Sequence, residues 1–185
     1  QLPQQKSLSI AEADLERFLA HTKGPASFLV LTLLYPNLRY AEVMFHQDHI
    51  HPFSKFTDEN LKSMSVVEAR FPEWYACRDS VPNLQLLEGR RNESKNATPL
   101  STWLKGMNDV EREAFTRGNF FPADVGFDFV NFVEFTTKRK ELLRIELRKV
   151  LKVQPASELQ PNLGMAVTSE EMYILAEAES EEDTA

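Results

Sequence analysis

The sequence has little cysteine and no long apolar segment, and each absence excludes a class of protein. Among its 185 residues Cys77 is the single cysteine, which rules out a disulfide framework and any zinc cluster built from cysteines alone. No apolar run approaches the roughly 18 residues of a membrane span, and the first residues lack a basic-then-apolar signal peptide. We therefore expect a cytoplasmic protein without a membrane partner.

Hydrophobic residues are plentiful enough for one well-packed core. They make up 42% of the chain, aromatic residues 10% and charged residues 26%, with a mean hydropathy of −0.38. A chain of this length and composition buries most of its surface on folding, which excludes a mainly disordered protein. Because the sequence begins with Gln1 rather than Met, we expect it to be a piece of a longer protein.

The net charge of −7 is unevenly distributed along the chain. Residues 154–185 contain eight of the 28 acidic residues and no Lys or Arg, so residues 1–153 hold 20 acidic against 21 basic residues, a balance of +1. We expect a neutral domain over residues 1–153 and an acidic, partly disordered tail over residues 154–185. The simplest role for the tail is to keep the protein soluble, and the alternative is that it mimics DNA and restrains the domain.

Apolar spacing and turn residues predict a mainly helical α+β fold. Capping pairs and helical spacing predict helices over residues 10–22, 26–34, 58–70 and 99–105, from 108 onward, and over 128–152. Weak alternation and a short apolar run predict strands over residues 42–50 and 83–87. The composition predicts irregular structure over residues 71–82 and a polar loop over residues 88–96.

Three of the four histidines lie within six residues, in the segment Phe45-His46-Gln47-Asp48-His49-Ile50-His51-Pro52. Imidazole acts as a base near neutral pH or binds a metal, and the adjacent carboxylate supplies a hard oxygen ligand for Mg²⁺ or Mn²⁺. A zinc site made of His46, His49 and His51 is a second interpretation, for which Cys77 is a poor fourth ligand. A surface loop in which the histidines gather by chance is the third.

Two later segments extend the pattern. The chain contains, in order, Asp-His-Ile-x-Pro at 48–52, Asn-Leu-x-Leu-Leu at 83–87 and Asn-x-x-Lys at 92–95. This order resembles the HNH branch of the ββα-metal (His-Me finger) nucleases over residues 46–95. The apolar segment at 28–36 and a Trp-containing helix after the motif are similar to the C-terminal nuclease domain of GmrSD-type modification-dependent restriction proteins. SspE-type phosphorothioate-sensing defence proteins carry a similar domain.

The resemblance implies a metal-dependent DNA endonuclease whose small ββα-metal motif is embedded among surrounding α-helices. It implies that His49 is the general base, that Asp48 and Asn92 hold one Mg²⁺ or Mn²⁺ ion, and that Asn83 supports the loop or the His49 ring. Lys95 would meet a phosphate as a point charge. DNA is the implied partner, together with an N-terminal sensor or NTPase domain outside this chain.

Strand geometry raises one objection to this assignment. In a regular strand Asp48 and His49 point to opposite faces, which separates the base from the metal ligand. The family places this pair where the strand gives way to a loop, and Pro52 agrees with such an ending. We therefore expect the strand to end close to His49.

Basic residues outside the motif are candidates for contact with the nucleic-acid backbone. Arg90 and Arg91 lie between the two last motif segments, and Lys140, Arg144 and Arg148 step by four and share a face of the predicted long helix. The alternative function is a catalytically inactive helical module that binds a partner or oligomerises through residues 130–152. The complete set of motif residues favours the nuclease.

Overall fold

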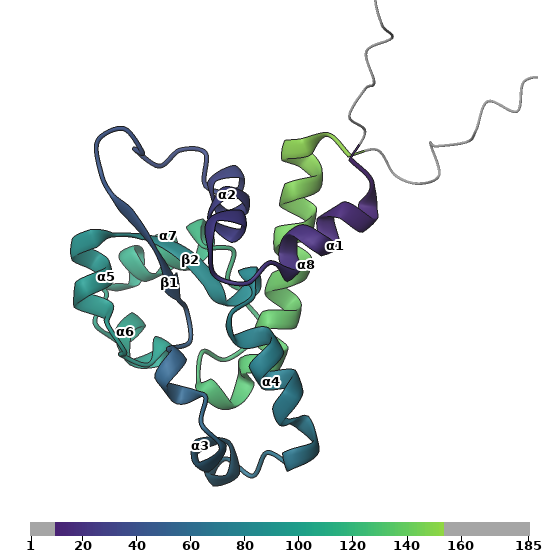
Figure 1. The fold of residues 1–185 in the computed structure, drawn as a ribbon. Coiled ribbons are helices and arrows are strands. Elements are labelled where there is room, and N and C mark those ends of the chain that lie inside the picture. The colour runs from purple at the N-terminus through teal and green to yellow at the C-terminus, as the bar shows by residue number, and fades with distance from the viewer. Residues whose placement is uncertain (1–9, 154–185) are drawn as a thin grey trace, which may run out of the picture. The chain divides into compact units, whose positions relative to one another are not determined.

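The computed structural model describes residues 10–153, which are mainly helical and contain a small two-stranded antiparallel sheet (Figure 1). This is the α+β class that the sequence predicts. The expected acidic tail lies outside the described residues. In the part of the chain that the structure describes, no helix combines the length and the apolar composition that crossing a membrane requires.

The elements follow one another with short connections, apart from the segments between α2 and β1 and between α7 and α8. In chain order they are α1 (Glu12–Ala20), α2 (Pro25–Leu34), β1 (Phe45–His49), α3 (Asp58–Ser63), α4 (Phe71–Arg78), β2 (Leu84–Glu88), α5 (Gly89–Lys95), α6 (Leu100–Lys105), α7 (Asp109–Gly118) and α8 (Phe132–Leu151). Four 3₁₀ turns interleave with them, at Phe53–Lys55, Glu68–Arg70, Val81–Asn83 and Phe129–Asn131.

Two helices begin with the capping hydrogen bonds that the sequence predicts. The Asn108 side chain accepts a hydrogen bond from the Glu111 backbone N–H at 2.9 Å, and the Glu111 carboxylate accepts one from the Asn108 N–H at 3.1 Å. Thr57 accepts from the Asn60 N–H at 3.2 Å and starts α3. These bonds satisfy donors that a helix start otherwise leaves unpaired, so both helices begin where the sequence predicts.

Three sequence predictions of local structure are wrong. Residues 71–82 contain helix α4, anchored by buried Phe71 and Trp74, and residues 88–96 contain helix α5 instead of a loop. The helix predicted over 58–70 ends at Ser63, because the chain turns at Ser65, whose φ of 61° is left-handed. Hydrophobic periodicity does not predict helix α5, because its sequence, GRRNESK, has no apolar face.

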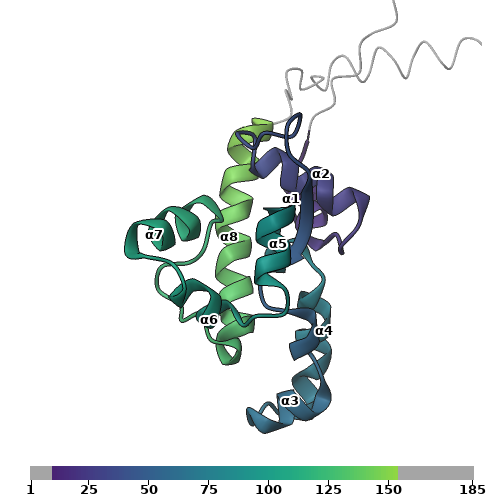
Figure 2. The ribbon, with the colours of Figure 1, turned by 90° about the vertical axis from the view of Figure 1, so that its left-hand side faces the viewer.

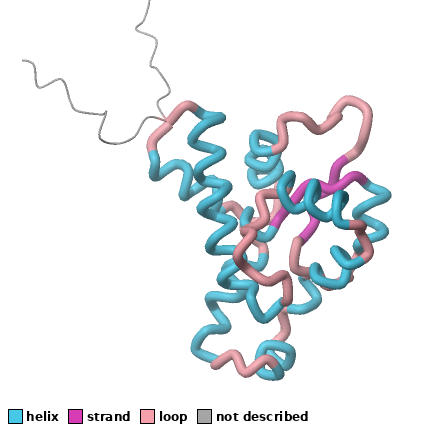
Figure 3. Tube along the Cα trace, turned by 180° about the vertical axis from the view of Figure 1, so that it is seen from behind, coloured by secondary structure: helices cyan, strands magenta, loops and turns pink. Residues whose placement is uncertain are grey.

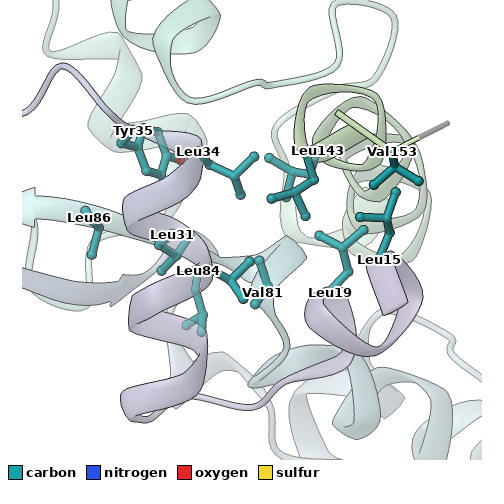
Figure 4. Close-up of a cluster of buried hydrophobic side chains, with 12 residues drawn as sticks. Leu15, Leu19, Leu31, Leu34, Tyr35, Val81, Leu84, Leu86, Leu143 and Val153 are labelled. Atoms are coloured by element: carbon teal, nitrogen blue, oxygen red, sulfur yellow. The ribbon is translucent and has the colours of Figure 1, made fainter. Parts of the chain in front are cut away.

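Strand β2 buries side chains on both of its faces. In Figure 3 the two strands, in magenta, lie among the helices. Leu84 and Leu86 of β2 join a core cluster with α1, α2 and α8, which includes Leu19, Leu31 and Leu143 (Figure 4). Leu87 points to the other face and joins a second cluster with α6 and α7. A third cluster is aromatic and contains Phe56, Trp74 and Phe132. Side chains that alternate along β2 therefore pack into two different core clusters, one on each face of the strand.

One buried cation joins α8 to the start of β2. Arg139 has no exposed surface. Its guanidinium donates hydrogen bonds to the carbonyl oxygens of Asn119, Val81, Pro82 and Leu84, at 2.7–3.3 Å, and to the Tyr35 hydroxyl at 3.0 Å. All of these acceptors are neutral, and the guanidinium carbon also lies 5.8 Å from the centre of the Phe121 ring. The hydrogen bonds fix the residues around Asn83 against α8.

Candidate active site

The site is built on β1, β2 and α5, which follow the order strand, strand, helix. The strands pair antiparallel with Asp48 opposite Gln85 and His49 opposite Leu84. Helix α5 begins directly after β2 and packs against both strands, so it lies across the sheet (Figure 2). The segments 45–49 and 84–95 are therefore neighbours, as the motif order predicts.

Asp48 forms a buried ion pair with Lys95. Lys95 Nζ lies 2.8 Å from Asp48 Oδ2 and donates to the His49 carbonyl oxygen at 2.7 Å, and the Lys95 side chain has no exposed surface. Gln85 Nε2 donates to the same Asp48 oxygen at 2.8 Å. Burial lowers the pKa of Lys95, and the attraction of Asp48 opposes this shift. In this arrangement the Lys95 ammonium is not accessible to a phosphate, which differs from its predicted role.

His49 ends β1 and is held by a carboxylate that the sequence reasoning missed. Its Nε2 lies 2.8 Å from Asp79 Oδ1, while Arg78 donates from Nε and Nη2 to Asp79 Oδ2 at 2.9 and 2.7 Å. Burial of Asp79 raises the pKa of its carboxyl, but the bonds from Arg78 and His49 outweigh burial and lower it. An ionised carboxylate only accepts, so His49 carries its proton on Nε2 and leaves Nδ1 as the basic nitrogen.

The environment of His49 keeps the ring neutral. Burial lowers the pKa of His49, and the carboxylates of Asp79 and Asp48 oppose this shift only in part. Its Nδ1 makes no hydrogen bond with the described residues, and the side chain is 11% exposed. A neutral imidazole with one free nitrogen at the surface is what a general base requires.

Asn83 fixes the loop that follows β1. It is fully buried; its Oδ1 accepts from the His51 N–H at 2.9 Å, and its Nδ2 donates to the carbonyl oxygens of His51 and Arg78 at 3.2 and 2.7 Å. The Ile50 N–H donates to the Asn83 carbonyl at 2.8 Å. Of the two roles that the resemblance implies for Asn83, these bonds correspond to support of the loop, whereas Asp79 holds the His49 ring.

The three clustered histidines lie in three different environments. His46 is exposed and borders α5, where a Cβ added at Gly89 would lie 3.6 Å from His46 Nε2. His51 is buried against the rings of Phe132 and Phe135. Among residues 10–153 no three His, Cys, Asp or Glu side chains gather closely enough to hold a metal ion. The structure thus does not assemble the zinc ligands of the second interpretation.

Replacing His51 with phenylalanine should remove part of the acid sensitivity of the fold. Burial lowers the pKa of His51 to about 3 in the folded chain. Between pH about 6.5 and 3, His51 is therefore protonated in the unfolded chain and neutral in the folded chain. Because the unfolded state then holds more protons, stability falls as the pH drops from 6.5 towards 3, by at most about 1.4 kcal/mol per pH unit. Urea unfolding of the wild type and of His51→Phe across this pH range measures the free energy of unfolding of each. The prediction is contradicted if the two free energies fall equally as the pH drops.

The donor set around Asp48 suits a hard divalent ion. Asn92 lies one helical turn before Lys95 on the same face of α5, and its side chain makes no hydrogen bond with the described residues. The buried Gln85 Oε1 beside Asp48 also lacks a partner in the described part of the chain. Carboxylate and amide oxygens are the ligands that Mg²⁺ and Mn²⁺ prefer. The donor chemistry of Asp48 and Asn92 therefore fits the ion that the resemblance implies, and Asp48 already pairs with Lys95.

The predicted contacts Arg90 and Arg91 lie at the far end of α5 from His49. Both are exposed and occupy the first turn of α5, which begins beside His46, whereas Lys95 at the other end lies beside His49. The Arg91 guanidinium lies 5.8 Å from the centre of the Phe115 ring. Arg91 also lines a cavity of about 500 Å³ between the sheet and α7. Contact with DNA at this end stays a prediction.

The basic stripe of α8 faces α1. Lys140, Arg144 and Arg148 share a face, as their spacing predicts, but Lys140 Nζ lies 2.6 Å from Glu16 Oε2. Arg148 Nε donates to Glu12 at 3.1 Å, and Arg144 lies 3.7 Å from the same carboxylate. Because acidic residues of α1 neutralise the stripe, it is not the free basic face that the sequence indicates, and its ion pairs join the first and last helices.

Asp79 and Arg78 carry no sequence signal for their role. They lie at the end of α4, 30 residues after His49, and fold back beside it through the isolated bridge between Thr22 and Ser80 and the Val81–Asn83 turn. A sequence motif defined by residue spacing does not include Asp79, because its contact with His49 depends on tertiary structure. Comparison with protein-family models gives no match to the chain, and comparison with curated proteins gives none either.

Proposed function

We propose that the chain is a metal-dependent DNA endonuclease of the ββα-metal (HNH) type and serves as the effector domain of a restriction or anti-phage defence protein. The observation that carries the proposal is the His49–Asp79 pair at the end of β1, next to the Asp48 carboxylate. The three motif segments come from places up to 47 residues apart in the sequence and meet on one small sheet and one helix. A fold that used them only for packing would not need a histidine with a free Nδ1 at the surface.

The geometry supports hydrolysis of a phosphodiester bond. His49 Nδ1 takes a proton from water, and the resulting hydroxide attacks phosphorus. The bond from phosphorus to the 3′ oxygen breaks, and that oxygen leaves with the electron pair and takes a proton from solvent water. Asp79 holds the Nε2 proton and stabilises the imidazolium that forms, while Asn83 keeps the loop after His49 in place. A divalent ion bound by Asp48 and Asn92 would neutralise the charge that develops on the leaving oxygen.

Supercoiled plasmid incubated with the protein and Mg²⁺ or Mn²⁺ tests this function. Nicked circles should appear with metal and not with EDTA. A His49→Ala preparation, purified in parallel, controls for contaminating nucleases. Plasmid that stays supercoiled with both metals, or nicking that the His49→Ala preparation retains, would contradict the proposal.

Replacing Asp79 with asparagine should slow nicking by about 10- to 100-fold, because Asp79 positions the base. The asparagine side chain removes a negative charge that raises the pKa of His49, so the acid limb of the pH–rate profile should move to lower pH. Asp79→Glu keeps a carboxylate and should restore part of the rate. A lower rate without any movement of the acid limb would mean that Asp79 is merely structural.

The alternative, an inactive module that associates through α8, has one observation in its favour. Helix α8 exposes Leu142 and Ile145, which are 38% and 45% exposed and lie on one face. Light scattering of the wild type and of Leu142→Lys/Ile145→Lys would show whether this face joins two copies. A dimer that the double variant abolishes, together with a protein that does not nick plasmid, would favour this alternative.

A further inference from the structure

An exposed aromatic ring lies beside the base. Of the 13 phenylalanines, all within the described residues, Phe53 alone is exposed, with 51% of its surface accessible. It follows Pro52 in the turn after β1, and its ring centre lies 5.7 Å from that of His49. Every other phenylalanine contributes to a core or lies partly covered, so the exposure of Phe53 at this place requires an explanation.

The ring is held in place by a cation. The Arg78 guanidinium carbon lies 4.1 Å from the centre of the Phe53 ring, within the range of a cation–π contact. Its Nε and Nη2 are bound to Asp79, whereas Nη1 makes no hydrogen bond with the described residues. Arg78 thus orients Phe53 and keeps one donor group free next to it.

A second cation completes the surface. The Lys23 backbone N–H donates to the Asp79 carbonyl at 2.8 Å, which places this residue beside the site. Its side chain is exposed and makes no ion pair with residues 10–153. Asp79 pairs with Arg78, and His49 is neutral, so Lys23 is the cation beside His49 that has no carboxylate partner among the described residues.

We propose that Phe53 is a stacking platform for an unpaired base next to the scissile phosphate, and that Arg78 and Lys23 contact the flanking phosphates. Aromatic rings stack on bases only where these are not already stacked in a duplex, and basic side chains beside them follow the backbone. The favoured substrate is then a nucleic-acid strand that is single or locally unpaired at the cleavage position. This inference rests on the proposed function, because it places the scissile phosphate at His49. The phosphates of a nucleic-acid strand would pair with the positive charge next to the ring.

Binding without metal tests the platform separately from cleavage. Fluorescence anisotropy in EDTA, at one fixed salt concentration, would compare a labelled single strand of about 12 nucleotides, within the usual site sizes, with the corresponding duplex. Phe53→Ala should weaken single-strand binding by about 5- to 150-fold, the range that base–aromatic stacking gives, and leave duplex binding unchanged. Phe53→Trp should keep the affinity, and its fluorescence should be quenched by the bound strand.

Val110→Ala serves as the matched control, because Val110 is 78% exposed on α7 and belongs to none of the contacts at the site. Lys23→Gln should reduce the salt slope of binding by about one, as expected for one lost phosphate contact. Absence of single-strand binding by the wild type would overturn the inference. Equal effects of Phe53→Ala on single strand and duplex, or no effect on either, would also overturn it.

The results distinguish this inference from the proposed function. If the wild type nicks plasmid but Phe53→Ala binds single strands normally, the platform is wrong and the nuclease stands. If the wild type never cleaves DNA but binds single strands through Phe53, base stacking on Phe53 stands, whereas the nuclease and the placement of a scissile phosphate at His49 are wrong. Circular dichroism of each variant shows that its fold is intact, which the exposure of Phe53 leads us to expect.

Discussion

Replacing His49 with alanine should slow DNA cleavage by about 10²–10⁴-fold, the usual contribution of a general base. The substitution removes the free Nδ1 and leaves Asp79 paired with Arg78, so no buried charge is stranded. Nicking of plasmid under single-turnover conditions measures the rate, and thermal unfolding shows that the fold persists. His46→Ala is the matched control, because His46 lies on the same strand but is exposed.

Three further results would bear on the role of His49. Added imidazole should restore part of the rate of His49→Ala, since a small base can enter the space of the missing ring. A variant that nicks plasmid as fast as the wild type would remove His49 from the mechanism. Loss of activity in His46→Ala as well would mean that the segment matters as a whole and not through one base.

Replacing Lys95 with methionine should lower the free energy of unfolding by about 3–5 kcal/mol, because it leaves the buried Asp48 carboxylate without its partner. The Lys95 side chain is fully buried and Asp48 is only 10% exposed, so solvent offers little compensation. In the double variant Lys95→Met/Asp48→Asn the stranded charge is absent, and most of the stability should return. Urea unfolding of the two single variants and the double variant completes the cycle.

The same variants test whether Asp48 binds a divalent ion. In Lys95→Met the freed carboxylate should bind Mg²⁺ or Mn²⁺, and the midpoint of unfolding should rise with metal concentration. The double variant lacks the carboxylate, so metal should leave its midpoint unchanged. If Lys95→Met is as stable as the wild type, the buried ion pair has little energetic importance, and metal-independent midpoints would contradict the ligand role of Asp48.

The strands were predictable from the sequence because their signals are local. The apolar run after Asn83 and the alternation before Pro52 indicate two strands. The structure confirms both, with β1 shorter than predicted and β2 shifted by one residue. Helix α5 was not predictable in this way. Its last residue, Lys95, forms an ion pair with Asp48 and so fixes the helix on the sheet. Hydrophobic periodicity does not predict such a contact, because both groups are polar.

For the site, sequence reasoning brings the motif residues together but does not give their partners. The spacing of Lys140, Arg144 and Arg148 correctly predicts a shared face, yet only tertiary structure shows that Glu12 and Glu16 oppose it. Asp79 is likewise recognised only when the chain folds back on His49. A linear pattern therefore identifies candidate groups, whereas their charge state and accessibility depend on neighbours distant in sequence.

The buried Arg139 also determines when the site can form during synthesis. Its hydrogen bonds reach back 55 to 58 residues to the segment that carries Asn83, and 104 residues to Tyr35. A ribosome delivers the chain from its N-terminus, so the strands and α5 leave the exit tunnel before the guanidinium that anchors them. A nascent chain thus lacks this anchor for the residues around Asn83 until Arg139, in the first half of α8, has emerged, which would delay any cleavage of DNA until most of the domain is made.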